Sequence, residues 1–164
     1  MKLPSFRRMQ RLFPVVVALH NGEEAFFMPK WVSAHRGQLP LHPPADAILL
    51  GLLLLTFAAF AVTHLSVQKG EQSVWAYLLF GSAAAMLMNV FVPHIPATLF
   101  FHQYTPGVLT AVLINLPFMS VLMIQAVRDH WVSGMRALRY ALLVPFAIGG
   151  SILVSFAILW KLAH

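Results

Sequence analysis

The stretch that decides the fold class runs from Asp46 to Val67 and reads DAILLGLLLLTFAAFAVTHLSV. After its first residue it contains no Asp, Glu, Lys or Arg, and as a helix it is long enough to cross the ~30 Å hydrocarbon core of a bilayer. Three further runs, at residues 74–94, 106–127 and 139–161, have a similar length and apolar character. The pattern therefore predicts an all-α, polytopic membrane helix bundle.

The composition of the whole chain excludes the other broad classes of protein. Of the 164 residues, 59% are hydrophobic and only 10% are charged, whereas soluble domains are about 25% charged. So few charges could not cover the surface of a soluble domain of this size, and a disordered chain would be far less apolar. The chain contains no cysteine, which excludes disulfides and Cys-ligated metal centres.

A fifth run from Leu12 to Pro29, LFPVVVALHNGEEAFFMP, is apolar except at its centre. As a helix it would be about 27 Å long. A basic segment before an apolar stretch also resembles a secretory signal, but no cleavage site follows, and we expect this helix to be retained. We therefore expect one membrane domain over residues 1–164 with about five transmembrane helices, near residues 12–29, 46–67, 74–94, 106–127 and 139–161.

The basic residues predict the orientation. With five spans, one side holds Lys2, Arg7, Arg8, Arg11, Lys69, Arg128, Arg136 and Arg139, and the other holds Lys30, Arg36 and Lys161. The richer side is expected to be cytoplasmic, which places the N-terminus inside. Because these charges lie at the ends of apolar runs, we expect membrane lipids as partners and no nucleic acid. A bacterial inner (plasma) membrane is the expected location, and the sequence does not indicate an oligomeric state.

Two acidic residues, Glu23 and Glu24, lie well within an apolar run, unlike the other three in the chain. A charged side chain inside a span costs roughly 2.5–3.5 kcal/mol on insertion scales, so this pair is a candidate functional site. On a helix, His20 lies one turn from Glu24 on the same face, and Glu23 is its i,i+3 neighbour. Two adjacent carboxylates cannot both ionise cheaply in a low dielectric, so we expect one to be protonated, bound to a cation or paired with His20.

The expected topology brings more polar residues to the same side of the membrane. The loop after the third span contains two histidines and a tyrosine, and each neighbouring span carries one asparagine. We therefore expect a polar site in the outer half of the bundle, open toward the outer leaflet. Its candidate members are His20, Glu23, Glu24, Asn89, His94, His102, Tyr104 and Asn115.

Two short motifs carry a family resemblance. Residues 20–24, HNGEE, match an H-x-x-E-E motif, and residues 104–107, YTPG, resemble a Y-x-P-G motif. A further histidine between them completes the pattern, and we favour His94 over His102. In this order the motifs resemble those of the HXXEE-domain family of small integral membrane proteins of unknown function. The resemblance implies that these residues act together, and it supplies no reaction.

One interpretation of these residues is a metal site. Nitrogen and oxygen ligands of this kind suit Zn, Fe or Mn. The candidate ligands are His20, Glu23, Glu24, His94 and His102. A carboxylate that does not bind the ion would act as a general base or hold a histidine tautomer.

Two interpretations need no metal. In the first, an acid–base enzyme acts on a lipid-like substrate, with His20, Glu23, Glu24, His94 and Tyr104 as catalytic residues and Asn89, Asn115, Pro106 and Gly107 in support. In the second, the chain is a non-enzymatic ion- or small-molecule-binding membrane protein or a transporter. We favour a membrane-embedded enzyme with an intramembrane His/Glu site, acting on a lipid-like substrate with or without a divalent metal.

Overall fold

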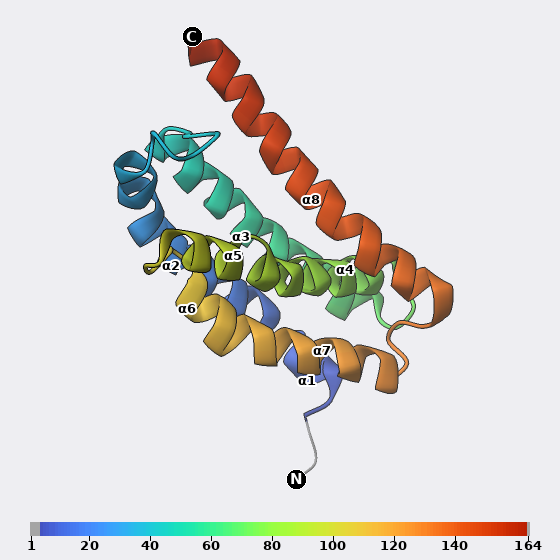
Figure 1. Cartoon of the computed structure of the whole chain (residues 1–164). Helices are drawn as coiled ribbons and strands as arrows, with labels where there is room; N and C mark the ends of the chain where they lie inside the picture. Colours follow the sequence, from blue (N-terminus) through green and yellow to red (C-terminus); the bar gives the residue numbers. More distant parts are fainter. Residues whose placement is uncertain (1–3, 164) are drawn as a thin grey trace.

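The computed structural model describes residues 4–163, and at residues 156, 157 and 159–163 it describes the backbone alone. All of the regular structure in this range is helical (Figure 1). The elements are α1 (Phe6–Met9), α2 (Phe13–Ala34), α3 (Ala45–Lys69), α4 (Val74–Asn89), η1 (Val90–His94), α5 (Ile95–Phe101), α6 (Val108–Thr110), η2 (Ala111–Asn115), α7 (Leu116–Arg128) and α8 (Gly134–Ala163). The all-α prediction is confirmed.

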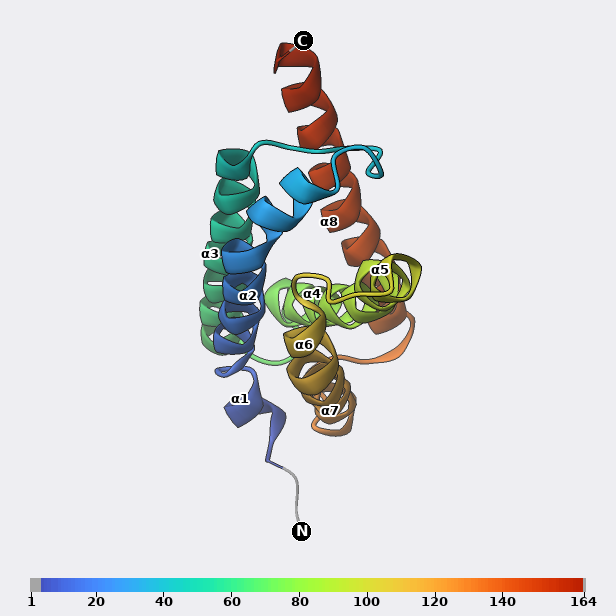
Figure 2. The ribbon, with the colours of Figure 1, turned by 60° about the vertical axis from the view of Figure 1, so that its left-hand side comes forward.

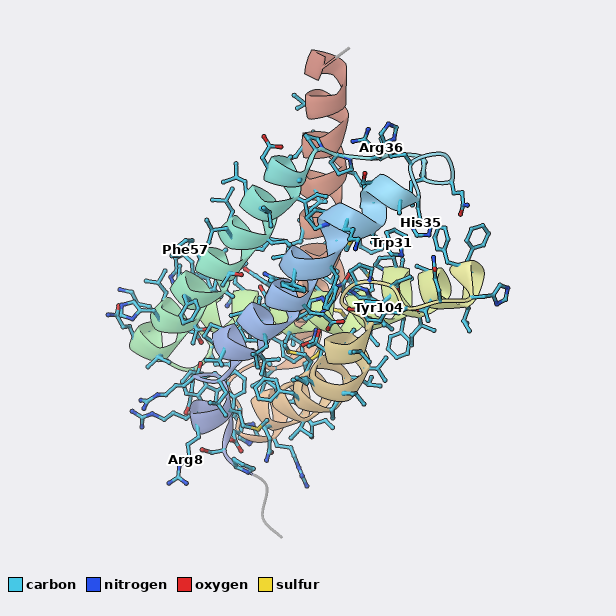
Figure 3. The ribbon with its side chains drawn as sticks, turned by 90° about the vertical axis from the view of Figure 1, so that its left-hand side faces the viewer. Arg8, Trp31, His35, Arg36, Phe57 and Tyr104 are labelled. Atoms are coloured by element: carbon cyan, nitrogen blue, oxygen red, sulfur yellow. The ribbon has the colours of Figure 1, made fainter. Side chains whose placement is uncertain are left out.

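Four helical runs in the described range are long and apolar enough to cross a membrane. They cover Ala45–Lys69, Val74–Phe101, Val108–Arg128 and Gly134–Ser155, and they correspond to four of the five expected spans. Phe57, on the first of these runs, points away from the other helices (Figure 3), as expected for a side chain that faces lipid.

The fifth expected span differs from these four. Helix α2 has 22 residues, about 33 Å at ~1.5 Å per residue, but it carries Glu23, Glu24 and Lys30. The count of five spans and the inside location of the N-terminus therefore stay predictions. Arg8 and Arg36, from the two expected sides, do lie at opposite ends of the molecule (Figure 3). The side chain of Lys161 lies outside the described residues.

Helix α2 also runs further than expected, through Pro29 to Ala34. Its last turn is closed by the His35 backbone N–H, which donates to the carbonyls of Trp31 and Val32 at 3.1 and 3.2 Å. Val32 is buried against the rest of the protein. These contacts beyond the proline stabilise the last turn, so the helix continues past Pro29 although Pro29 has no N–H for the carbonyl of Ala25.

Helix α4 is central, because it packs against α3, α7 and α8. Figures 1 and 2 show α2 and α3 side by side, with the run from α4 to α5 crossing them steeply. At Gly81 of α4, a Cβ atom would lie 2.6 Å from Val144 Cγ2 and 2.7 Å from the backbone oxygen of Tyr140. Glycine therefore lets α4 and α8 touch at the level of the backbone, the close packing that small residues allow between membrane helices.

The apolar core lies at the end of the molecule where α1, α4 and α7 meet. Its largest fully buried members are Tyr77, Phe6, Phe13, Leu79, Met119 and Leu122. The polar residues of the HNGEE motif lie further along α2, away from this core.

Two irregular turns interrupt the helices beside those polar residues. Between α4 and α5 the backbone leaves the helical region at Val92 (φ −148°, ψ 112°), and the Val92–Pro93 peptide bond is cis. Between α6 and α7 lies the π-helical turn η2, which ends two residues before Pro117. In a regular α-helix the ring of Pro117 would clash with the carbonyl four residues earlier. Single π-helical turns within α-helices are often found at functional sites.

Candidate functional site

The HNGEE motif forms a little more than one turn of α2, and its side chains point to different neighbours. Asn21 faces α3, where its side-chain nitrogen donates to the Leu52 carbonyl at 3.1 Å and to the Thr56 hydroxyl at 2.8 Å. His20 and Glu24 share another face, as their i,i+4 spacing predicts. One turn of helix therefore both anchors α2 to α3 and presents polar groups to the segments after α4.

His20, Glu24 and His94 form a compact group. One ligand atom from each lies within 4.8 Å of those of the other two. The Glu24 carboxylate is 3.3 Å from His94 Nε2 and 3.7 Å from His20 Nε2, and the two imidazole rings meet edge to face with centroids 5.0 Å apart. His20 and His94 are 1% and 2% exposed, so the group lies inside the protein.

Asn89 sits between the two histidines. Its side-chain amide nitrogen lies 3.1 Å from His20 Nε2 and 3.0 Å from His94 Nε2. With the amide as donor, both Nε2 atoms act as acceptors and turn their lone pairs toward the centre of the group. An unprotonated imidazole nitrogen is the form that binds a metal ion.

The YTPG segment covers the group from one side. Gly107 has φ +88°, and a Cβ atom there would clash with His94 Cε1 and lie 2.9 Å from Glu24 Cγ. Pro106 is fully buried, and Thr105 is buried with its hydroxyl 2.6 Å from that of Thr98. Both the backbone conformation and the lack of space require glycine at position 107.

Glu23 is directed at this same segment rather than at the histidines. Its Oε1 accepts hydrogen bonds from the Tyr104 hydroxyl (2.6 Å), the Gly107 N–H (3.1 Å) and the Leu109 N–H (3.3 Å). Its Oε2 accepts from the backbone N–H and the hydroxyl of Thr110, at 2.8 and 2.6 Å. The two adjacent glutamates therefore have different surroundings: Glu24 faces two imidazoles and Glu23 faces hydrogen-bond donors.

Tyr104 is partly exposed at the rim of the site (Figure 3). Its ring packs edge to face on Phe27, with centroids 5.5 Å apart. Partial burial and then the hydrogen bond to Glu23 raise the pKa of Tyr104 above its usual value. Tyr104 therefore stays a neutral phenol near pH 7, and its hydroxyl donates a hydrogen bond to Glu23.

Two of the predicted site residues lie apart from the group. His102 is exposed at the end of α5, in a left-handed conformation (φ 50°), and it is not part of the group formed by His20, Glu24 and His94. Asn115 is fully buried in η2, and neither polar atom of its side chain has a hydrogen-bond partner among the described residues.

Sequence reasoning missed Thr110. Its hydroxyl lies 2.8 Å from His20 Nδ1 and 2.6 Å from Glu23 Oε2, so it bridges two residues of the motif. The available signal was a hydroxyl three residues after Gly107 in an otherwise apolar run.

Together, the fold and the site define a class: a helical protein with helices that could span a membrane and an internal His/Glu group that could hold a metal ion. The chain belongs to the family described as "Protein of unknown function with HXXEE motif", which it matches over residues 11–122. It is also similar to the "Uncharacterized protein YrkK" of Bacillus subtilis (strain 168), with 26% identity over 113 residues that cover 69% of this chain and 71% of the relative. No solved structure matches it.

Proposed function

We propose that this protein is a membrane-embedded enzyme that holds a divalent metal ion between His20, Glu24 and His94 and acts on a lipid-like substrate. The observation that carries this proposal is the approach of three ligand atoms to within 4.8 Å of one another inside the protein. His20 and Glu24 are one turn apart on α2, and η1 brings His94, 70 residues after Glu24, to the same face.

The chemistry of the donors favours a metal ion. Two imidazole nitrogens and one carboxylate oxygen are a ligand set that suits Zn, Fe or Mn and leaves a position for water or substrate. A metal ion in such a site supplies a Lewis acid or an activated water. Among the described residues, the Glu24 carboxylate faces Nε2 of the two histidines, which supply no positive charge as neutral rings, so a cation would also neutralise a largely buried carboxylate.

The surroundings favour an apolar substrate. Phe27 and Leu109 are both exposed, although Phe27 packs on Tyr104 and the Leu109 backbone N–H donates to Glu23. Tyr104 adds an aromatic ring against Phe27 at the rim. A substrate with a hydrocarbon chain would find an apolar approach on this side, with the polar group behind it.

Metal analysis tests the proposal directly. We expect detergent-purified wild-type protein to contain one Zn, Fe or Mn per chain, and we expect His20→Ala and His94→Ala to lose it. His102→Ala is the matched control, because this exposed histidine lies outside the group, and it should keep the metal. An equal metal content in wild type and His20→Ala would contradict the proposal, as would no binding of any of the three ions when added.

We also propose that the protein lies in a bacterial inner membrane with the site toward the outer side. The basic residues support this orientation, because eight of the eleven are expected on the side of Arg8 and three on the side of Arg36, and these two residues lie at opposite ends of the molecule (Figure 3). Since the chain has no cysteine, a single Arg8→Cys or Gln38→Cys substitution gives a clean probe. An impermeant maleimide applied to spheroplasts should label position 38 and spare position 8, and the reverse result would overturn the orientation.

A further inference from the structure

We infer that Glu23 and Thr110 are positioning residues that keep a proton on His20 Nδ1 and so leave His20 Nε2 free to bind a metal ion. This inference deepens the proposed function and rests on it for the role of the ion, although the proton arrangement itself is a property of the metal-free protein. Its basis is the line of short contacts from Glu23 Oε2 to Thr110 Oγ1 (2.6 Å) and from there to His20 Nδ1 (2.8 Å).

The groups around Glu23 determine which atom donates in each of these hydrogen bonds. Four groups besides the Thr110 hydroxyl donate to its carboxylate, and three of them are backbone N–H groups, which can only donate. Five donors thus point at the two oxygens of this carboxylate, so both oxygens act as hydrogen-bond acceptors.

The Thr110 hydroxyl then has one way to satisfy both neighbours. It has a single proton, and at 2.6 Å from an accepting oxygen of Glu23 that proton lies between the two oxygens. Its second acceptor in reach, the Gly107 carbonyl at 3.2 Å, also only accepts. The hydroxyl therefore has lone pairs but no proton for His20, so His20 Nδ1 must be the donor in the remaining 2.8 Å contact.

This arrangement fixes the other side of the ring. With its proton on Nδ1, a neutral His20 has its lone pair on Nε2, the atom that faces Asn89 and Glu24. A hydrogen bond from the second ring nitrogen of a ligating histidine to a carboxylate is common at metal sites, where it sets the tautomer. Here the hydroxyl of Thr110 lies between His20 and the carboxylate of Glu23. Because His20 also faces Glu24, these contacts connect the two glutamates of the motif.

The direct test is the tautomer of His20 in metal-free protein. Protein labelled with 15N-histidine is stripped with a chelator in detergent and studied by long-range 1H–15N correlation, with the His20 signals assigned from their loss in His20→Gln. We expect Nδ1 protonated and Nε2 unprotonated in the wild type. Thr110→Val, which keeps the shape but removes the hydroxyl, should reduce this preference, and Thr110→Ser should preserve it.

A second measurement connects the tautomer to the ion. Zn²⁺ affinity should fall about 10–100-fold in Thr110→Val and stay near the wild-type value in Thr110→Ser. Thr110→Ala is a second variant without the hydroxyl, for use if the valine variant does not fold, as judged by circular dichroism and elution volume.

The outcomes separate this inference from the proposed function. A wild-type His20 with the proton on Nε2, or a Thr110→Val protein with an unchanged tautomer, overturns the inference even if the protein binds zinc. Unchanged Zn²⁺ affinity in folded Thr110→Val also overturns it. The expected tautomer in a wild-type protein that binds no metal supports the hydrogen-bond arrangement and overturns the metal site.

Discussion

The apolar core and the His–Glu site are built by different means. The core around Phe6, Phe13 and Leu122 consists mainly of apolar side chains that pack against one another. The site joins α2, η1 and the YTPG segment through short polar contacts, most of them to Glu23 or between the two histidines and Asn89. We therefore expect core substitutions to lower stability without removing the metal, and site substitutions to remove the metal whether or not they also lower stability.

Gly107→Ala should have the largest effect on both binding and stability. Position 107 needs a positive φ and has no room for a Cβ atom. A Cβ atom would clash with His94, and an L-residue at φ +88° is disfavoured by a further ~1–2 kcal/mol. We expect metal binding to be lost and the protein to be less stable by about 2–4 kcal/mol. Metal content and thermal unfolding in detergent measure the two effects, and Gly37→Ala, with open space around it, is the control.

Leu122→Ala should have the opposite profile. Leu122 is fully buried in the core, and its truncation leaves a cavity that lowers stability by about 2–3 kcal/mol. We expect an earlier unfolding transition with an unchanged metal content below it. Loss of the metal from folded Leu122→Ala would show that the two regions are not independent.

Gly81→Ala tests the contact between α4 and α8 at the edge of the core, away from the His–Glu site. The added methyl group would lie 2.6 Å from Val144 Cγ2 and force the helices apart at a cost of about 1–3 kcal/mol. Double substitution with Val144→Ala removes Cγ2 but leaves Val144 Cβ and the backbone oxygen of Tyr140, each 2.7 Å from the added methyl group, so it should recover only a small part of the loss in unfolding temperature. Equal stability of Gly81→Ala and wild type would mean that α8 is not closely packed at this point.

Tyr104→Phe should have the smallest effect, because it removes one hydrogen bond to Glu23, worth about 1 kcal/mol. The raised pKa of Tyr104 adds a pH dependence. Its neutral form is favoured by folding, so this contribution is present below pH ~10 and is lost as the pH rises toward the raised value. The stability difference between wild type and Tyr104→Phe should therefore shrink above pH 10, and a difference that grows with pH would contradict the assignment.

Local patterns were enough to predict the helices and one face of α2. The apolar run at residues 46–67 lies within α3, and the i,i+4 spacing of His20 and Glu24 places them together. These are properties of one helix, so they follow from helical periodicity alone.

The remaining features depend on segments that are distant in the chain. Glu23 and Thr110 are 87 residues apart, and no spacing rule connects them. Which glutamate faces the histidines depends on where η1 and the YTPG segment pack, so sequence reasoning assigned both to one site. The exposed position of His102 depends in the same way on the left-handed turn that ends α5.

The many partners of the HNGEE turn also have a consequence for biogenesis. Synthesis of α2 is complete long before the chain reaches Gly107 and Thr110, which supply most of the donors to Glu23. Until those residues emerge, both glutamates of α2 lack their partners, and each would cost roughly 2.5–3.5 kcal/mol inside a bilayer. We therefore expect helix α2 to reach its final depth only after the chain through α6 has been inserted, so a helix that is synthesised before α3 to α6 settles after them.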